Sequence, residues 1–475
     1  VAQKPILTGR LQSILRLAGS SIQLSDEYSE DRKLLYYVRA YEQPTSQSAK
    51  HDSAEAYAEA LPALGHHTLK QECLEAGQSL RQTGLVSAYT EGLFQHVAAR
   101  DFDLLPILLH LDAHGQAEFE RHPKLIGKLV EAGITPHFRQ SIFGLACLLE
   151  RGLLSRPAVE SALKNFLQLE VHPESAAWLS HHHADAAHHQ ALLTGGLFCI
   201  LGQPLGIGQG MNPTCQSARG LSMWSQHAPA KLINMVINAV SYHNLEMRYG
   251  DDHIRSRDFL NPDTKQFDFN LDPIQVVMVH HLDAIYQEMM RRAPFKHPVQ
   301  EPHASVNPAF YGHWIPTGFA SPYKPMLNAI QGYDDFVRRF YAGFHPDYNG
   351  GSWMVYPNPV GIIITSANAE MLGFHAVSML RVGKDKQGRW RIYFLNPNNE
   401  GRQNWGQEIK PTVSGHGEKA GESSLPFHEF LSRLYAFHYN TVAVEDHMEN
   451  VPAEEIARVR KLAQASWGKS YLWMD

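Results

Sequence analysis

Cys215 stands where a helix is expected to begin, at the end of Gln209-Gly210-Met211-Asn212-Pro213-Thr214-Cys215. Asn212 is a good N-cap residue and Pro213 suits the first helical position, so Cys215 is expected in the first helical turn. At that place the helix dipole and free backbone N–H groups favour the thiolate and lower the pKa of the thiol. Because the thiolate is the reactive form, the placement predicts a nucleophile. The alternative is a buried cysteine on an apolar helix face.

His375 and Asn396 flank a predicted β-hairpin whose strands cover residues 375–382 and 389–395. Its turn is expected around Asp385-Lys386, midway between the two residues. This symmetry predicts cross-strand neighbours on one face of the hairpin. The Asn396 amide oxygen would then accept a hydrogen bond from one imidazole nitrogen, leaving the other to take a thiol proton. The alternative is a strand histidine with a purely structural role.

The remaining cysteines lack such surroundings. The sequence has 4 cysteines and no CxxC pair, which argues against a zinc ribbon, a redox dithiol or a disulfide scaffold. Cys147 and Cys199 lie in apolar runs and are expected in the core. Cys73 lies in a polar helical stretch without catalytic neighbours.

The amino-acid composition limits the classes of protein to which this chain can belong. The chain has 475 residues, 44% hydrophobic and 19% charged, with a net charge of −6. This is typical of a globular protein of two or three domains, and the charge does not favour nucleic-acid binding. No apolar run is long enough to predict a membrane span, and the start, Val1-Ala2-Gln3-Lys4, lacks a signal-peptide pattern.

The apolar spacing predicts an α+β fold in which a helical N-terminal domain, residues 1–200, precedes a second domain, residues 201–475. The second domain is expected to begin with helices over 213–248 and 273–292. Its strands are expected late, over 360–365 and in the hairpin that carries His375.

Residues 294–325 hold many prolines and aromatic side chains, so they cannot form one regular element. They are interpreted either as an ordered surface loop or as part of the wall of a substrate cleft.

Together, Gln209, Cys215, His375 and Asn396 resemble the papain-like cysteine protease superfamily, in their order along the chain and in the six-residue interval from Gln209 to Cys215. The resemblance covers about residues 200–400, and Asn396-Pro397-Asn398 is similar to the form found in divergent bacterial effector proteases. It implies a papain-like domain with a helical subdomain and an antiparallel sheet. It also implies that Gln209 and the Cys215 N–H stabilise an oxyanion, that no cofactor is needed, and that the substrate is a protein or peptide.

The same resemblance leaves the reaction open, because the residues around Cys215 differ from those of plant-type proteases and no Asn-Ser-Trp follows the strand. Peptide-bond cleavage is the first expectation, and glutamine deamidation or transglutamination with the same triad is the second. A third interpretation is a non-enzymatic helical scaffold with a degenerate hydrolase domain. The N-terminal helices are candidates for binding a protein partner, and the likeness to effectors implies secretion or translocation into a host cell.

Histidines supply a competing hypothesis, because the chain contains 28 of them, several within residues 181–189. On one helix, His182, Asp185 and His189 would share a face, and two histidines with a carboxylate can bind zinc. His110 and His114 would share a face in the same way. The simpler interpretation, a polar and histidine-rich helix end without metal, is the one we expect.

Overall fold

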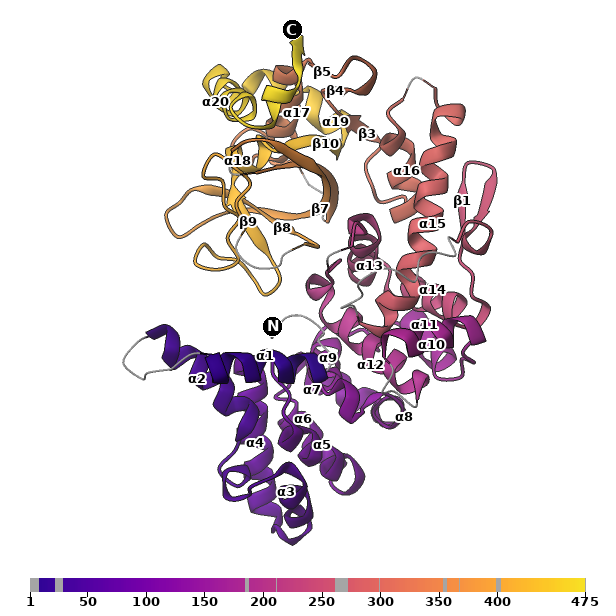
Figure 1. Ribbon diagram of the computed structural model, residues 1–475, viewed down its shortest axis with the longest axis vertical. Coiled ribbons are helices and arrows are strands. Elements are labelled where there is room, and N and C mark those ends of the chain that lie inside the picture. The colour runs from indigo at the N-terminus through magenta and orange to yellow at the C-terminus, as the bar shows by residue number, and fades with distance from the viewer. Residues whose placement is uncertain are drawn as a thin grey trace. The chain divides into compact units, whose positions relative to one another are not determined.

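A computed structural model describes residues 8–21, 29–183, 188–210, 212–260, 272–298, 300–352, 357–366, 368–398 and 403–474. The chain divides into two compact units, and Figure 1 labels most of their helices and strands. The first division along the chain falls between Ile207 and Gly208, near the expected boundary at residue 200. Unit 1 comprises Val1–Ile207, Trp224–Asn244 and Asn270–Met278, and unit 2 comprises Gly208–Met223, Leu245–Phe269 and Val279–Asp475.

Unit 1 is built from helices in its described parts. Two of them, α9 and α12, approach closely because Gly144 has no side chain, and a Cβ there would lie 2.8 Å from the backbone nitrogen of Cys199. The α-helices assigned to this unit are α1 (Thr8–Ser21), α2 (Ser29–Glu42), α3 (Ala54–Ala60), α4 (His66–Thr83), α5 (Ala88–Arg100), α6 (Leu105–Leu108), α7 (Ala113–Arg121), α8 (Pro123–Gly133), α9 (Ser141–Glu150), α10 (Pro157–Phe166), α11 (Pro173–His182), α12 (His189–Gly202) and α14 (Pro229–Tyr242).

Unit 2 contains an antiparallel sheet with the strand order β3-β10-β6-β7-β8-β9. Most of its strands come late in the sequence, so the expected α+β class with a late antiparallel sheet is confirmed. The strands are β3 (Gly318–Ala320), β6 (Asn358–Thr365), β7 (Met371–Lys384), β8 (Trp390–Leu395), β9 (Ser423–Pro426) and β10 (Leu434–Tyr439).

Helices and two smaller sheets complete unit 2. The α-helices that lie wholly or partly in it are α13 (Cys215–His227), α15 (Pro273–Lys296), α16 (Pro302–Tyr311), α17 (Tyr333–Phe344), α18 (Phe427–Leu431), α19 (Thr441–Glu445) and α20 (Ala453–Gln464). The smaller sheets join β1 (Glu246–Tyr249) to β2 (Asp252–Arg255), and join β11 (Leu472–Met474), β5 (Ala329–Gln331) and β4 (Tyr323–Lys324).

Two local expectations need correction. The helical pattern over 213–248 is two helices followed by the first strand of a hairpin, because β1 starts at Glu246. The stretch 294–325 is not a surface loop throughout, since α16 forms within it and buries Phe310 and Tyr311. Proline at the first turn of α16 is compatible with a helix, which explains why proline content alone was misleading.

The described helices all fall short of the length or the apolar character that crossing a bilayer requires.

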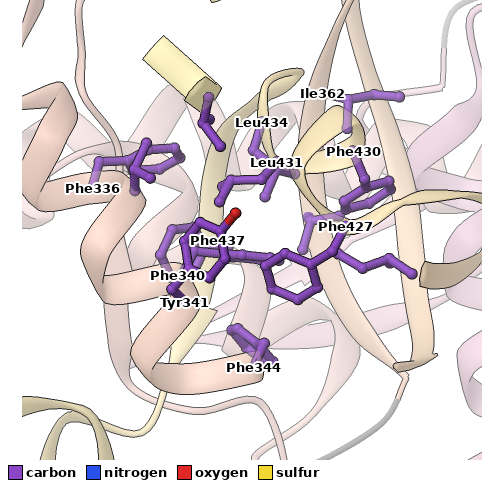
Figure 2. Close-up of a cluster of buried hydrophobic side chains, with 14 of the residues drawn as sticks. Phe336, Phe340, Tyr341, Phe344, Ile362, Phe427, Phe430, Leu431, Leu434 and Phe437 are labelled. Atoms are coloured by element: carbon purple, nitrogen blue, oxygen red, sulfur yellow. The ribbon is translucent and has the colours of Figure 1, made fainter. Parts of the chain in front are cut away.

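Aromatic side chains form the core of unit 2 between helix α17 and the sheet. Phe336, Phe340 and Phe344 are spaced four residues apart, so they share one face of α17. Figure 2 shows this face turned toward Phe437 on β10 and Phe427 on α18. The ring centroids of Phe340 and Phe437 are 5.0 Å apart, in an edge-to-face arrangement.

We expect Phe340→Ala to lower the free energy of unfolding by roughly 3–5 kcal/mol, because the truncation leaves a cavity in a fully buried cluster. Urea unfolding followed by tryptophan fluorescence measures the loss. Phe295→Ala is the matched control, because Phe295 is 83% exposed, and it should change stability by no more than about 0.5 kcal/mol. Equal losses in the two variants would contradict this assignment of the core.

Candidate active site

Helix α13 begins at Cys215, which confirms the expected place of this cysteine in a first helical turn. The N-cap differs from the prediction. The Thr214 carbonyl accepts the first helical hydrogen bond from Ala218 N–H at 3.1 Å, so Thr214 occupies the N-cap position in place of Asn212. The Asn212 side chain instead donates to the Gln209 carbonyl at 3.1 Å within the preceding loop.

The Cys215 thiol is partly exposed, and burial raises its pKa. The predicted fall in pKa at the helix start is therefore wrong in direction. Three groups oppose the rise: the backbone N–H of Ala376, the positive charge of Arg219 and the backbone N–H of Gln216. The carboxyl group of Asp283 acts in the opposite sense.

The other thiols are less suited to reaction. Cys73 and Cys199 are buried, and burial raises the pKa of Cys73 to about 12 and that of Cys199 well above its ordinary value. Cys147 is partly exposed, but burial also raises its pKa to about 12. Cys199 lies in the core as expected, whereas Cys147 is only partly buried.

His375 and Asn396 are joined by a hydrogen bond of 2.8 Å between the imidazole Nε2 and the amide Oδ1. Both side chains are buried. Burial lowers the pKa of His375 to about 4. The hydrogen bond to Asn396 opposes this shift, and the positive charge of Arg219 adds to it. The imidazole is therefore neutral at neutral pH, and its Nδ1 remains available to accept a proton.

The register of the hairpin differs from the one expected. Ser378 pairs with Leu395, so Asn396 continues opposite Val377, two residues from His375. The turn is centred later than expected, because Lys384 pairs with Trp390, and this alone would place Asn396 opposite Ser378. An irregularity between Met379 and Arg381 moves the pairing back by one residue. His375 and Asn396 are consequently diagonal neighbours on one face, which long side chains can still bridge.

Gln209 lies beside the end of β8. Its backbone N–H donates to the Pro397 carbonyl at 2.8 Å, and its side-chain Nε2 donates to the Asn212 carbonyl at 2.7 Å. The side chain is buried, and its Oε1 has no hydrogen-bond partner among the described residues. An amide nitrogen carries two protons, so one of them remains for a ligand oxygen.

Arg219 joins the helix of Cys215 to the sheet of His375, a role that the sequence did not suggest. It lies one turn after Cys215, is only 2% exposed, and donates through Nη1 to the carbonyls of Val360 on β6 (3.0 Å) and Val377 on β7 (3.2 Å). Its Nε and Nη2 donate to the Tyr311 hydroxyl on α16 at 3.0 and 2.8 Å. The i, i+4 spacing from Cys215 was the only signal in the sequence.

A small cavity lies between α13, α16 and the sheet. Ala376, whose backbone N–H acts on the pKa of Cys215, forms part of its wall, and Gly361 is the β6 residue paired with Ala376. A Cβ on Gly361 would lie 2.5 Å from the Tyr435 ring, so glycine is required there. The stretch 294–325 contributes to this wall as well. The lining residues are Gln216, Arg219, His303, Asn307, Phe319, Pro359, Val360, Gly361, Ala376, Tyr435 and Ala436.

The histidines considered as zinc ligands do not share helix faces as the sequence suggested. Helix α11 ends at His182 and α12 begins at His189, so these two histidines do not share a helix face, and Asp185 lies outside the described residues. His110 has a left-handed backbone, with φ of 49°, and precedes the helix of His114. Within the described parts of the chain, no three histidine, cysteine or acidic side chains gather as a metal site would require.

No protein-family model, curated protein or solved structure matches this chain. The chemistry of the site is therefore argued from its contacts. The thiol of Cys215 is partly exposed, and its pKa is lowered by the backbone N–H of Ala376, the residue after a neutral, oriented imidazole. This combination suits general-base activation of a cysteine.

We expect iodoacetamide to label Cys215 faster than Cys73, Cys147 or Cys199 at neutral pH, by mass-spectrometric mapping of the alkylated peptides. Because burial raises its pKa, the Cys215 rate should still climb beyond the pH of about 8.5 at which an ordinary thiol is half ionised. A rate plateau from pH 5 to 8 would instead indicate a resting thiolate–imidazolium pair. Labelling of Cys215 no faster than Cys73 would contradict its assignment as the nucleophile.

Arg219→Met should slow Cys215 alkylation at a fixed pH by roughly tenfold relative to Arg219→Lys, because only the lysine variant keeps a positive charge near the thiol. Both variants lose the hydrogen bonds of the guanidinium, so their comparison separates charge from structure. Circular dichroism checks that both variants fold. Identical alkylation profiles in two folded variants would show that the charge of Arg219 does not act on Cys215.

Proposed function

We propose that this protein is a papain-like cysteine hydrolase that cleaves peptide bonds. Cys215 serves as the nucleophile, His375 as the base, and Asn396 as the residue that orients the base. The observation that carries the proposal is the 2.8 Å hydrogen bond between His375 Nε2 and Asn396 Oδ1, made on the strand whose next residue, Ala376, lowers the pKa of the Cys215 thiol through its backbone N–H.

The thiol and imidazole begin as a neutral pair, because burial raises the pKa of Cys215 and lowers that of His375. His375 accepts the thiol proton as the sulfur attacks the substrate carbonyl carbon. The resulting oxyanion accepts hydrogen bonds from the Cys215 N–H and the Gln209 amide. The imidazolium then protonates the leaving amine, and water hydrolyses the acyl-enzyme with His375 again as base.

The arrangement of unit 2 supports this assignment over a degenerate scaffold. The nucleophile begins a helix, the base lies on an antiparallel sheet, and a buried arginine joins the two elements. Maintaining a buried guanidinium and a buried histidine is costly unless their partners are arranged for them. A scaffold without catalysis would gain nothing from leaving the thiol partly exposed beside them.

A library of proteome-derived peptides, incubated with the protein and sequenced by mass spectrometry, tests the reaction. New peptide N-termini are expected. Conversion of glutamine to glutamate would identify a deamidase, and glutamine–amine crosslinks a transglutaminase, and either outcome would replace the proposed cleavage. Reporting on all three products in one sample avoids choosing a substrate in advance.

Cys215→Ala should abolish the product, and Asn396→Ala should reduce its rate by roughly 10²-fold or more, because the base loses its orientation. Cys147→Ala is the matched control, since Cys147 is also a partly exposed cysteine but lies in unit 1, on α9. Product formation by Cys215→Ala at the wild-type rate would overturn the proposal.

A further inference from the structure

Gln403 connects Asn396 to a tryptophan. Its side-chain Oε1 accepts hydrogen bonds from Asn396 Nδ2 and from the Trp405 indole Nε1, each at 2.9 Å. Its Nε2 donates to the Asn398 carbonyl. The His375–Asn396 pair is therefore the inner end of a longer chain of hydrogen bonds.

The indole fixes the direction of this chain. An amide side chain can turn over and exchange its oxygen and nitrogen, but an indole N–H can only donate. Trp405 therefore requires that Gln403 present its oxygen. Asn396 must then point its NH₂ group at that oxygen, which leaves the Asn396 oxygen facing His375. An oxygen in that place accepts, so His375 must carry its proton on Nε2.

The backbone of Asn398 imposes the same direction. Its N–H, which can only donate, bonds to Asn396 Oδ1 at 3.1 Å, and its carbonyl, which can only accept, receives Gln403 Nε2. Three groups of fixed polarity thus agree: the Trp405 indole N–H and the Asn398 N–H and C=O. Gln403 transmits two of these constraints to Asn396.

Trp405 is itself firmly held. It is 1% exposed, and its carbonyl accepts a hydrogen bond from the Thr365 hydroxyl at the end of β6. The buried Arg433 donates to Thr365 Oγ1 at 3.0 Å and to the Gly406 carbonyl at 2.8 Å. These bonds fix the loop that carries the indole, so the direction of the chain does not depend on a mobile side chain.

We propose that Gln403 and Trp405 are positioning residues that select the tautomer of His375. With the proton on Nε2, the lone pair lies on Nδ1, the nitrogen left to take the Cys215 proton. The opposite tautomer would place a proton on Nδ1 and remove the base. The catalytic consequence rests on the proposed function, whereas the tautomer itself follows from the hydrogen bonds alone.

The test replaces the fixed-polarity groups in two steps. Trp405→Phe removes the indole donor and keeps an aromatic ring, and Gln403→Leu removes both constraints that pass through Gln403. Trp390→Phe is the matched control, because the Trp390 indole donates to Asp347 Oδ2 at 2.7 Å and not to this chain. Thermal unfolding checks that each variant is folded, and two variants keep the test decisive if one fails.

The first readout is the ¹⁵N chemical shift of each ring nitrogen of His375 by NMR, assigned with a His375→Gln variant. Wild type and Trp390→Phe should show protonated Nε2. The share of the Nδ1-protonated form should rise in Trp405→Phe and rise further in Gln403→Leu. A merely structural role for these side chains would not produce this graded shift.

The second readout is the rate of Cys215 alkylation by iodoacetamide at pH 7. Loss of the orienting groups should lower it by roughly 10- to 100-fold, as for other groups that orient a functional histidine. A share of the Nδ1-protonated form in folded Gln403→Leu no larger than in wild type would overturn the proposal. A tautomer shift with unchanged alkylation would support tautomer selection and count against the proposed function, so the two failures are distinguishable.

Discussion

The Arg219 guanidinium is the contact on which the candidate site depends, because it joins the helix of Cys215 to the strand of His375. Burying a cation is unfavourable unless its donors are all satisfied. Here they reach two backbone carbonyls, the Tyr311 hydroxyl and, at 2.6 Å, Gln216 Oε1. These partners are neutral, so the positive charge is not cancelled by them and acts on Cys215. Arg219 therefore both positions the helix of Cys215 and places a positive charge near its thiol.

Burial sets the protonation states that the rest of the chemistry must use. It raises the pKa of Cys215 and lowers that of His375, which makes the neutral pair the resting state. The Asp283 carboxyl, which accepts a hydrogen bond from Ser217 on α13, disfavours the thiolate further. Burial raises the pKa of this carboxyl to about 6. Arg219 and the N–H groups of Ala376 and Gln216 counter these effects. In the proposed mechanism, activation would therefore depend on proton transfer during attack and not on a preformed ion pair.

The sequence was sufficient for features that depend on local rules. A helix start at Cys215 and a hairpin between His375 and Asn396 follow from capping, periodicity and turn residues. The exact register did not follow, because the turn is centred later than the midpoint of His375 and Asn396 and an irregularity in β7 shifts the pairing again by one residue. Asn212 was misassigned as the N-cap because its side chain has a competing partner in its own loop.

The side chains that form hydrogen bonds with buried polar groups could not be predicted from the sequence. Arg219 and Tyr311 are separated by 92 residues and meet only in the folded chain. Gln403 and Trp405 occupy a loop, where no periodicity marks them. The helix and the strand could be predicted, but not the residues that hold them together.

Strand β6 forms hydrogen bonds to both sides of the candidate site. Near its start, the Val360 carbonyl accepts a hydrogen bond from Arg219, which lies on the helix of Cys215. At its end, Thr365 accepts a hydrogen bond from Arg433 and donates one to the Trp405 carbonyl. The Trp405 indole in turn fixes the direction of the hydrogen bonds that lead to His375. Both arginines are almost wholly buried, so neither bond is weakened by competition with water. The helix of Cys215 and the loop that orients His375 through Asn396 are thus both bonded to one strand, and a displacement of β6 would disturb both together.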